Sequence, residues 1–236
     1  MGTLVGTPQA SYAAAGATSI NHSYGTSVNS GDVALVAVAG YHDTATVSSV
    51  TSSVATSSIV QVGTLLRTAT VVSPELFIDV YELVFSASGT PTFTGNYSAT
   101  VADRSLRSIV WRGIDNTTRV EATAGAATNT DTPTSATGNI VQSNPGPISS
   151  FHADYPWPAA HNHDVGTPST GWTEWGDTAT GGDNKYQNFA SGGTRNGNFT
   201  WTDTGSNDFS AVRAAALRDA AAAGSILRQM MNYHGG

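Results

Sequence analysis

The stretch that most constrains the fold lies near the middle of the chain, at residues 104–113. Its side chains alternate between two sets, Leu106, Ser108 and Val110 on one side and Arg107, Ile109 and Trp111 on the other. This period of two predicts a β-strand with two unlike faces. Gly113 ends the pattern, and residues 114–117 predict a turn, because Asp115 and Asn116 can hydrogen-bond to backbone two residues further along.

Other segments repeat this signal on both sides of it. Residues 31–39 form an apolar run of strand length that can be buried on both faces. Residues 75–85 alternate strongly, and the Gly- and Pro-containing stretch that follows predicts a β-hairpin over residues 86–97. Short strands separated by Gly, Pro and Asn turns are typical of an all-β sandwich.

The composition supports one ordered domain. A chain of 236 residues fits a single large β domain. Only 11% of the residues are charged, against about 25% in an average soluble domain, and Ser, Thr, Asn and Gly take their place. We expect residues 1–223 to form one β-sandwich domain with a long loop insertion at 151–182, followed by a C-terminal arm at 224–236.

The charge and the residue types argue against several classes of partner. The net charge is −7, and one lysine and nine arginines are spread along the chain, so nucleic acid is not an expected partner. There is no cysteine to form a disulfide or a thiolate metal site. No apolar run approaches the roughly 18 residues of a membrane span, so no membrane association is expected.

Three segments together carry a family resemblance. The end of the central strand reads Trp-Arg-Gly-Ile-Asp at 111–115, residues 31–38 read Gly-Asp followed by an apolar strand, and residues 211–219 read Ala-Val-Arg-Ala-Ala-Ala-Leu-Arg-Asp. In order and spacing, over residues 20–220, they resemble the YRGVD-type, jelly-roll-like virion structural proteins of tailed bacteriophages. Trp111 stands where that family more often has Tyr, and no Pro follows Arg218.

The resemblance implies both a fold and a role. The fold would be all-β, an antiparallel two-sheet sandwich of jelly-roll type. The role would be that of a structural accessory protein on the outer virion surface, a capsid decoration, cement or head-fibre subunit made in the host cytoplasm without an export signal. Its expected partners are the major capsid protein and neighbouring copies in a homo-oligomer, for which a trimer is one option. The alternative is a receptor- or glycan-binding module of a tail fibre or tail tip.

Residues 151–182 hold the candidate binding surface. The segment shows neither a strand nor a helix period and is rich in aromatic and histidine side chains, namely Tyr155, Trp157, His161, His163, Trp172 and Trp175. The aromatic rings could stack on the sugars of a host glycan. Alternatively, they pin the loop to its own domain or to a neighbouring subunit, and this second interpretation is favoured.

Metal and catalytic chemistry receive little support. His161, His163 and Asp164 could reach one ion from an extended backbone, but a solvated polar loop is the favoured interpretation, so no metal or cofactor is expected. Familiar catalytic motifs are absent from the sequence. Glycoside hydrolysis needs two carboxylates about 5–10 Å apart, for which Glu174 with Asp177 or Asp183 is the one aromatic-flanked candidate. We expect no enzyme.

The C-terminal region contains a conflict between two signals. Residues 211–223 are alanine-rich, and intrinsic propensity favours a helix. The resemblance favours a final strand over residues 209–218, which we adopt. Beyond Gly224 the arm carries large side chains that we expect to pack on a neighbouring subunit: Ile226, Leu227, Met230, Met231 and Tyr233.

Overall fold

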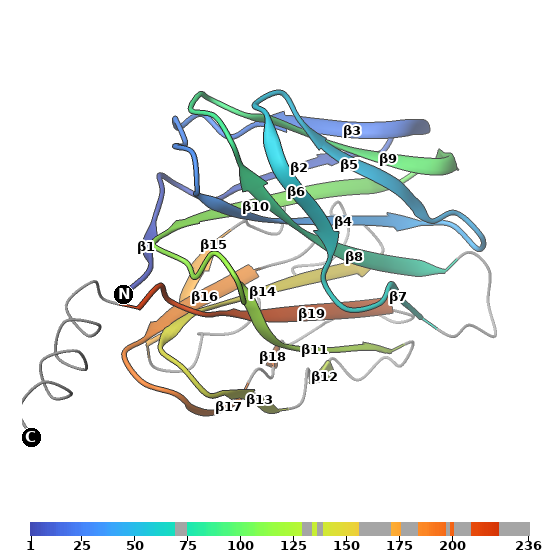
Figure 1. The fold of residues 1–236 in the computed structure, drawn as a ribbon. Helices are drawn as coiled ribbons and strands as arrows, with labels where there is room; N and C mark the ends of the chain where they lie inside the picture. Colours follow the sequence, from blue (N-terminus) through green and yellow to red (C-terminus); the bar gives the residue numbers. More distant parts are fainter. Residues whose placement is uncertain are drawn as a thin grey trace, which may run out of the picture.

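The protein is built from layered antiparallel β-sheets (Figure 1). The computed structural model describes residues 1–68, 75–128, 134–135, 139–155, 171–175, 184–196, 199–200 and 209–221. Every regular element in these ranges is a strand, which confirms the all-β prediction. Within the same ranges, no helix is long and apolar enough to cross a membrane.

A seven-stranded sheet, called here the central sheet, forms the middle of the molecule. Its main path runs in the order β1 (Thr3–Leu4), β10 (Arg104–Arg112), β4 (Val33–Tyr41), β8 (Leu76–Phe85) and β6 (Thr56–Gln61). Two further strands extend it, since β2 (Gln9–Ala13) pairs with β10 and β7 (Leu66–Arg67) pairs with β8. The sequence signals at residues 31–39, 75–85 and 104–113 are thus the three adjacent strands β4, β8 and β10.

Two other sheets lie on opposite sides of the central sheet (Figure 1). The three-stranded sheet has the order β3 (Ala17–Ser23), β9 (Thr92–Val101) and β5 (Val47–Ser52). The five-stranded sheet has the order β11 (Val120–Thr128), β19 (Phe209–Leu217), β14 (Gly146–Tyr155), β16 (Asn184–Phe189) and β15 (Thr173–Trp175).

The alternation along β4 explains this layering. Val36 and Val38 pack into a cluster with Phe93 of the three-stranded sheet. Leu35 and Ala37 face the other way and pack with Phe151 of the five-stranded sheet. An apolar strand such as β4 loses most contact with water only when both faces are covered. We predicted a sandwich of two sheets, but the central sheet is covered by one sheet on each side. The predicted number of sheets is therefore wrong.

A smaller cluster lies on the far side of the five-stranded sheet. Ile148, Ala214 and Ala216 of that sheet pack with Ile140 of β13 (Asn139–Gln142). β13 pairs with β17 (Gly193–Asn196), and β12 (Thr134–Ser135) pairs with β18 (Phe199–Thr200). The small alanine side chains allow the covering strands to approach the sheet closely.

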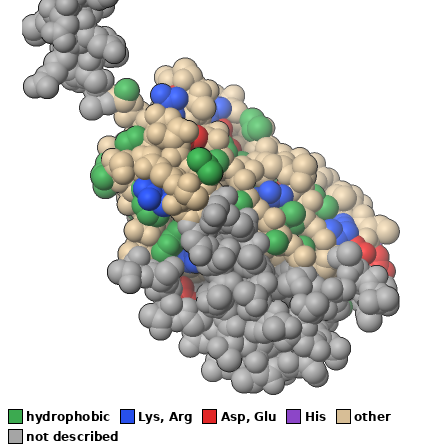
Figure 2. Space-filling model, turned by 90° about the horizontal axis from the view of Figure 1, so that it is seen from below, with side chains coloured by type: hydrophobic (Ala, Val, Ile, Leu, Met, Phe, Trp, Pro, Cys, Tyr) green, Lys and Arg blue, Asp and Glu red, His purple; other side chains and the backbone are tan. Residues whose placement is uncertain are grey.

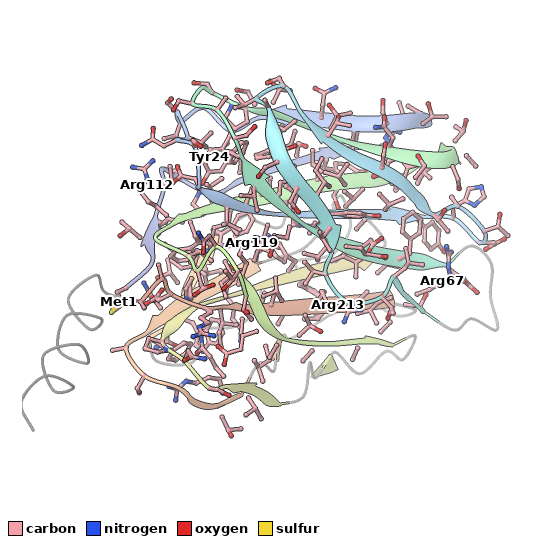
Figure 3. The ribbon with its side chains drawn as sticks, viewed as in Figure 1. Met1, Tyr24, Arg67, Arg112, Arg119 and Arg213 are labelled. Carbon is pink, nitrogen blue, oxygen red and sulfur yellow. The ribbon has the colours of Figure 1, made fainter. Side chains whose placement is uncertain are left out.

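Arginine side chains tie the central sheet to the chain around the five-stranded sheet (Figure 3). Arg119 donates from Nε to Glu82 Oε1 on β8 at 2.5 Å. Arg213 on β19 donates to the backbone carbonyl of Thr64. Charged hydrogen bonds of this kind fix the relative position of layers that apolar contact alone would leave free to slide.

The hairpin expected over residues 86–97 is wrong. β8 belongs to the central sheet and β9 to the three-stranded sheet, so the turn between them carries the chain from one layer to the next. Phe85 and Phe93 both point into the cluster between these layers, with ring centroids 6.2 Å apart. The alternation predicted both strands correctly, but it contains no information on which sheet each strand joins.

The two other regional predictions have different outcomes. Residues 209–217 form β19, as predicted, and every side chain from Ala211 to Leu217 is buried. In the segment 151–182, by contrast, residues 151–155 continue strand β14 and residues 173–175 form β15. These described parts are strand instead of loop, because residues 151–155 pair with β19 and residues 173–175 pair with β16 in the five-stranded sheet.

Candidate binding site at the Arg112 corner

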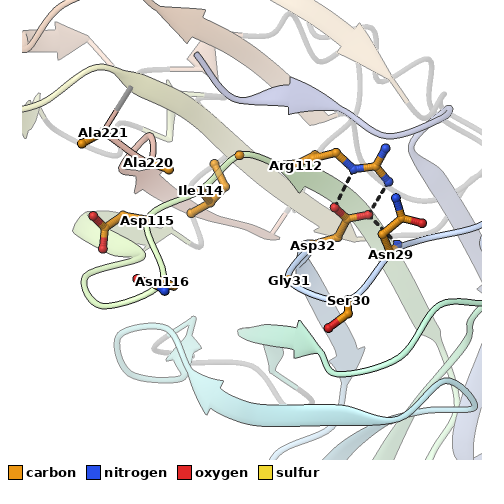
Figure 4. Close-up of a pocket in the computed structure, with 11 residues that line it drawn as sticks. Asn29, Ser30, Gly31, Asp32, Arg112, Ile114, Asp115, Asn116, Ala220 and Ala221 are labelled. Atoms are coloured by element: carbon orange, nitrogen blue, oxygen red, sulfur yellow. Dashed lines mark hydrogen bonds and ion pairs between the residues drawn. The ribbon is translucent and has the colours of Figure 1, made fainter. Parts of the chain in front are cut away.

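An open hollow of about 540 Å³ lies where β10 ends and β4 begins (Figure 4). Its lining includes four of the five residues of the Trp-Arg-Gly-Ile-Asp segment at 111–115, namely Arg112 to Asp115. Its lining comes from three separate parts of the chain: residues 29–32, residues 112–116, and Ala220 with Ala221.

A bidentate ion pair forms one wall of the hollow. Arg112 donates from Nε to Asp32 Oδ1 at 2.8 Å and from Nη2 to Oδ2 at 2.7 Å. The carboxylate also accepts the backbone N–H of Asn29 at 2.8 Å. This hydrogen bonding raises the pKa of Arg112. The Asp32 side chain is buried, while that of Arg112 is 47% exposed, so the guanidinium is both fixed in place and open to a partner.

The corner after Arg112 is fastened to the end of β19. Gly113 has φ +77°, a left-handed conformation that a side chain would strain. Its carbonyl accepts the N–H of Ala220 at 2.8 Å, and Asp115 N–H donates to the carbonyl of Arg218 at 2.8 Å. The floor of the hollow therefore joins the last strand of the central sheet to the last strand in the described chain.

Asp115 supplies a permanent negative charge at the other wall. Its Oδ1 accepts the hydroxyl of Thr117 at 2.6 Å and the backbone N–H groups of Thr117 and Thr118, each at 2.8 Å. These hydrogen bonds lower the pKa of Asp115 to about 2, and the one from the Thr117 hydroxyl makes the largest contribution to this shift. The carboxylate therefore stays ionised at every pH at which the protein would function.

The hollow is suited to a polar chain segment. Its walls present a guanidinium, a carboxylate and the amide side chains of Asn29 and Asn116, while Ile114 and two alanines supply a small apolar floor. Small-molecule sites are usually more enclosed and more apolar. Sequence reasoning missed this site because Asp32 and Arg112 lie 80 residues apart, although the Gly-Asp pair before an apolar strand was a visible signal.

The structure places three of the predicted binding-surface residues. Trp175 is buried, and its ring meets Phe151 edge-on at a centroid distance of 6.0 Å. Trp172 is half-buried against Phe189, also at 6.0 Å. Tyr155 is the last residue of β14. The two tryptophans thus contact the protein itself.

Glu174 lies on β15 directly opposite Lys185 on β16. Lys185 Nζ lies 4.8 Å from the centroid of the Trp172 ring. Burial lowers the pKa of Lys185 to about 8, and the negative charge of Glu174 opposes this shift. Glu174 is therefore placed beside the single lysine of the chain.

The other candidates lie outside the described residues. This applies to Trp157, His161, His163 and Asp164, to Asp177 and Asp183, and to the arm residues Ile226, Leu227, Met230, Met231 and Tyr233. Among the residues that the structure describes, no group of three or more His, Cys, Asp or Glu side chains could hold a metal ion. On the described part of the face seen in Figure 2, the basic side chains are scattered between uncharged atoms.

Comparison with known proteins adds no relative: no protein-family model, no curated protein and no solved structure matches this chain. The class that the fold defines is an all-β protein of several antiparallel sheets, consistent with a β-sandwich.

Proposed function

We propose that this chain is a structural accessory protein of a tailed-phage virion, a capsid decoration, cement or head-fibre subunit on the outer surface. Its partners in this role are the major capsid protein and other copies of itself, and it performs no catalysis. The proposal includes a jelly-roll topology for the first half of the chain. The strand order of that half is the observation that carries it.

Apart from β6 and β7, which pair with β8 in the central sheet, the strands from β2 to β10 alternate between two layers. In the central sheet the order is β2, β10, β4, β8, and in the three-stranded sheet it is β3, β9, β5. Each late strand thus returns to lie between two early ones: β10 lies between β2 and β4, and β9 lies between β3 and β5. Nested returns of this kind are Greek keys, and two of them in facing sheets make a jelly roll, a fold common in viral capsid domains.

The position of the signature segment agrees with this topology. Trp111 and Arg112 end β10, the last strand of the nested set, and Gly113 to Asp115 form the corner that follows. The five-stranded sheet would then be an additional layer carried on the outer face of the jelly roll.

The packing of Trp172 and Trp175, the two described tryptophans of the candidate binding surface, favours the structural role over glycan binding. A sugar platform needs an exposed ring face, but Trp175 is 8% exposed, and one neighbour of Trp172 is the buried Lys185. The location of the hollow also fits a subunit contact. Its lining includes Ala221, three residues before the proposed C-terminal arm at 224–236.

Co-sedimentation with undecorated capsids tests the proposal. The full chain should bind saturably, and a chain truncated after Ala223 should lose binding, because the arm would supply the apolar contact at about 1.5–3 kcal/mol per large side chain. A Trp157→Ala variant is the control, since a decoration protein should keep its capsid binding without that ring. Failure of both the full and truncated chains to bind would reject the decoration role and move the test to host cells and glycans.

A further inference from the structure

Strand β6 has an open edge. It pairs with β8 from Thr56 to Gln61, with a register shift between Thr56 and Ser58, and among the described strands none pairs along its other side. β5, which precedes it, pairs only with β9 in the part of the chain that the structure describes. The central sheet therefore ends at β6 with a row of backbone groups facing outward.

The hydrogen-bond alternation identifies those outward groups. Val62 N–H donates to the carbonyl of Val80 at 2.7 Å, which marks these two residues as a hydrogen-bonded pair. In an antiparallel ladder such pairs recur every second residue, so Val60 and Ser58 also direct their backbone toward β8. The N–H and C=O groups of Ile59 and Gln61 therefore point away from the sheet.

The same strand exposes two large apolar side chains on opposite faces. Ile59 is 41% exposed and Val60 is 51% exposed. Val60 lies beside a hollow it shares with Glu82 and Arg119, and Ile59 faces the other side, where Gln61 reaches Asp79. The flanking layers that cover β4 on both faces thus leave this strand partly uncovered on each face.

Charge does not protect this edge. Natural edge strands are usually guarded by Lys, Pro or a very short length. β6 has six residues, Thr-Ser-Ser-Ile-Val-Gln, with no proline and no charge. Residues 44–66 as a whole contain no Asp, Glu, Lys or Arg, although the chain carries a net charge of −7. Two copies that meet at this edge avoid the like-charge contact that would oppose association elsewhere.

We propose that β6 is a self-association edge, through which two copies of the chain pair antiparallel and join their central sheets across a twofold axis. A twofold axis brings the same strand of each copy together in antiparallel orientation, so one edge suffices for both partners. The outward groups of Ile59 and Gln61 supply the new hydrogen bonds. Ile59 and Val60 supply apolar contact, and the inference does not depend on the virion role.

Sedimentation of the purified full chain at about 10–500 µM tests this pairing. The weight-average mass should rise with concentration toward twice that of the monomer. Ile59→Lys should remain monomeric, because it brings two ammonium groups together near the axis. Val141→Lys is the matched control, since Val141 is 61% exposed on a different sheet, and it should associate like the unmodified protein.

Amide exchange gives a second measurement that does not depend on a substitution. The Ile59 and Gln61 amides should exchange slowly at high concentration and quickly at low concentration, whereas the Val60 amide stays protected at both. If Ile59→Lys unfolds, Val60→Lys replaces it, judged by an unchanged melting temperature. A monomer at every concentration would overturn the proposal, and the partner of the β6 edge would then be a strand of a different protein. An Ile59→Lys protein that still dimerises would also overturn it.

Discussion

Trp111 on β10 donates its indole N–H to Ser149 Oγ on β14 at 3.1 Å, and this hydrogen bond joins the central sheet to the five-stranded sheet. Both side chains are fully or almost fully buried, and the Trp111 ring also meets Tyr186 edge-on at 5.5 Å. The residue that the sequence marked as the end of the key strand is thus also a contact between layers.

Removal of this bond should weaken the attachment of the five-stranded sheet. Ser149→Ala should lower the free energy of unfolding by about 1–3 kcal/mol, because the buried indole N–H loses its acceptor. Trp111→Phe should cost more, since it also removes ring volume. Urea unfolding of both single variants and the double variant measures the coupling. Strictly additive costs would show that the bond contributes nothing beyond packing.

His22 makes the fold sensitive to acid. Its Nε2 lies 2.7 Å from Ser108 Oγ and its Nδ1 lies 3.2 Å from Ser11 Oγ, so it links β3 to two strands of the central sheet. Burial lowers the pKa of His22 from 6.5 to about 4. The unfolded chain therefore binds the proton more readily, and the stabilising contribution is complete above pH 6.5 and is lost as the pH falls toward 4.

The His22 effect can be separated from that of other titrating groups. Between pH 7.5 and 4.5 it should amount to about 2–3 kcal/mol of unfolding free energy. His22→Gln should remove that part of the pH dependence, while His42→Gln should retain it. Equal pH slopes in the His22→Gln variant and the unmodified protein, measured by urea unfolding, would refute this assignment.

The Arg112–Asp32 ion pair at the candidate site should contribute to the free energy of unfolding. Arg112→Met leaves the buried Asp32 carboxylate without its bidentate partner and should cost about 2–4 kcal/mol of unfolding free energy. Arg112→Lys should recover only part of this, because an ammonium cannot reproduce two parallel hydrogen bonds. Thermal and urea unfolding measure both variants. An Arg112→Met protein as stable as the original would mean that solvent replaces the guanidinium at no cost.

Gly146 is predicted to tolerate no side chain. Its φ is +154°, and a Cβ atom there would lie 2.0 Å from the Leu217 carbonyl oxygen, closer than any contact allows. Gly146→Ala should cost more than about 4 kcal/mol or prevent folding, because β14 and β19 would have to separate. Gly25→Ala is the control: φ is +75° and nothing lies within 4 Å of the new Cβ, so about 1 kcal/mol is expected. Similar melting temperatures for the two variants would contradict this.

Lys185 offers a direct test of the environment beside Glu174. As the single lysine, it can be followed by NMR after selective labelling of its ε-amine. Its pKa should be about 8, and Glu174→Gln should lower it further, because the carboxylate favours the charged amine. An unshifted lysine titration would mean that the amine is solvated, against the burial described above.

Local sequence pattern was enough to find the principal strands. Period-two alternation located β8 and β10, and an unbroken apolar run located β4. Local propensity failed for β19: its alanine-rich sequence favours a helix, and the strand over residues 209–218 was predicted only from the resemblance. At the candidate site the sequence indicated both the Trp-Arg-Gly-Ile-Asp corner and the Gly-Asp pair at residues 31–32, but not the ion pair between Arg112 and Asp32. The predictions of β4, β8 and β10 share a cause, since side-chain direction within one strand depends only on neighbouring residues.

Tertiary structure decided what each strand pairs with. The turn after β8 leads to another sheet instead of a hairpin. Residues 151–155 are strand because they pair with β19, and residues 173–175 are strand because they pair with β16. The five-stranded layer could not be read from periodicity, because a half-buried and a fully covered strand can share one apolar pattern. The sequence by itself determined where the chain is extended and which strands needed burial on two faces. Only long-range packing determined which layers supply that burial.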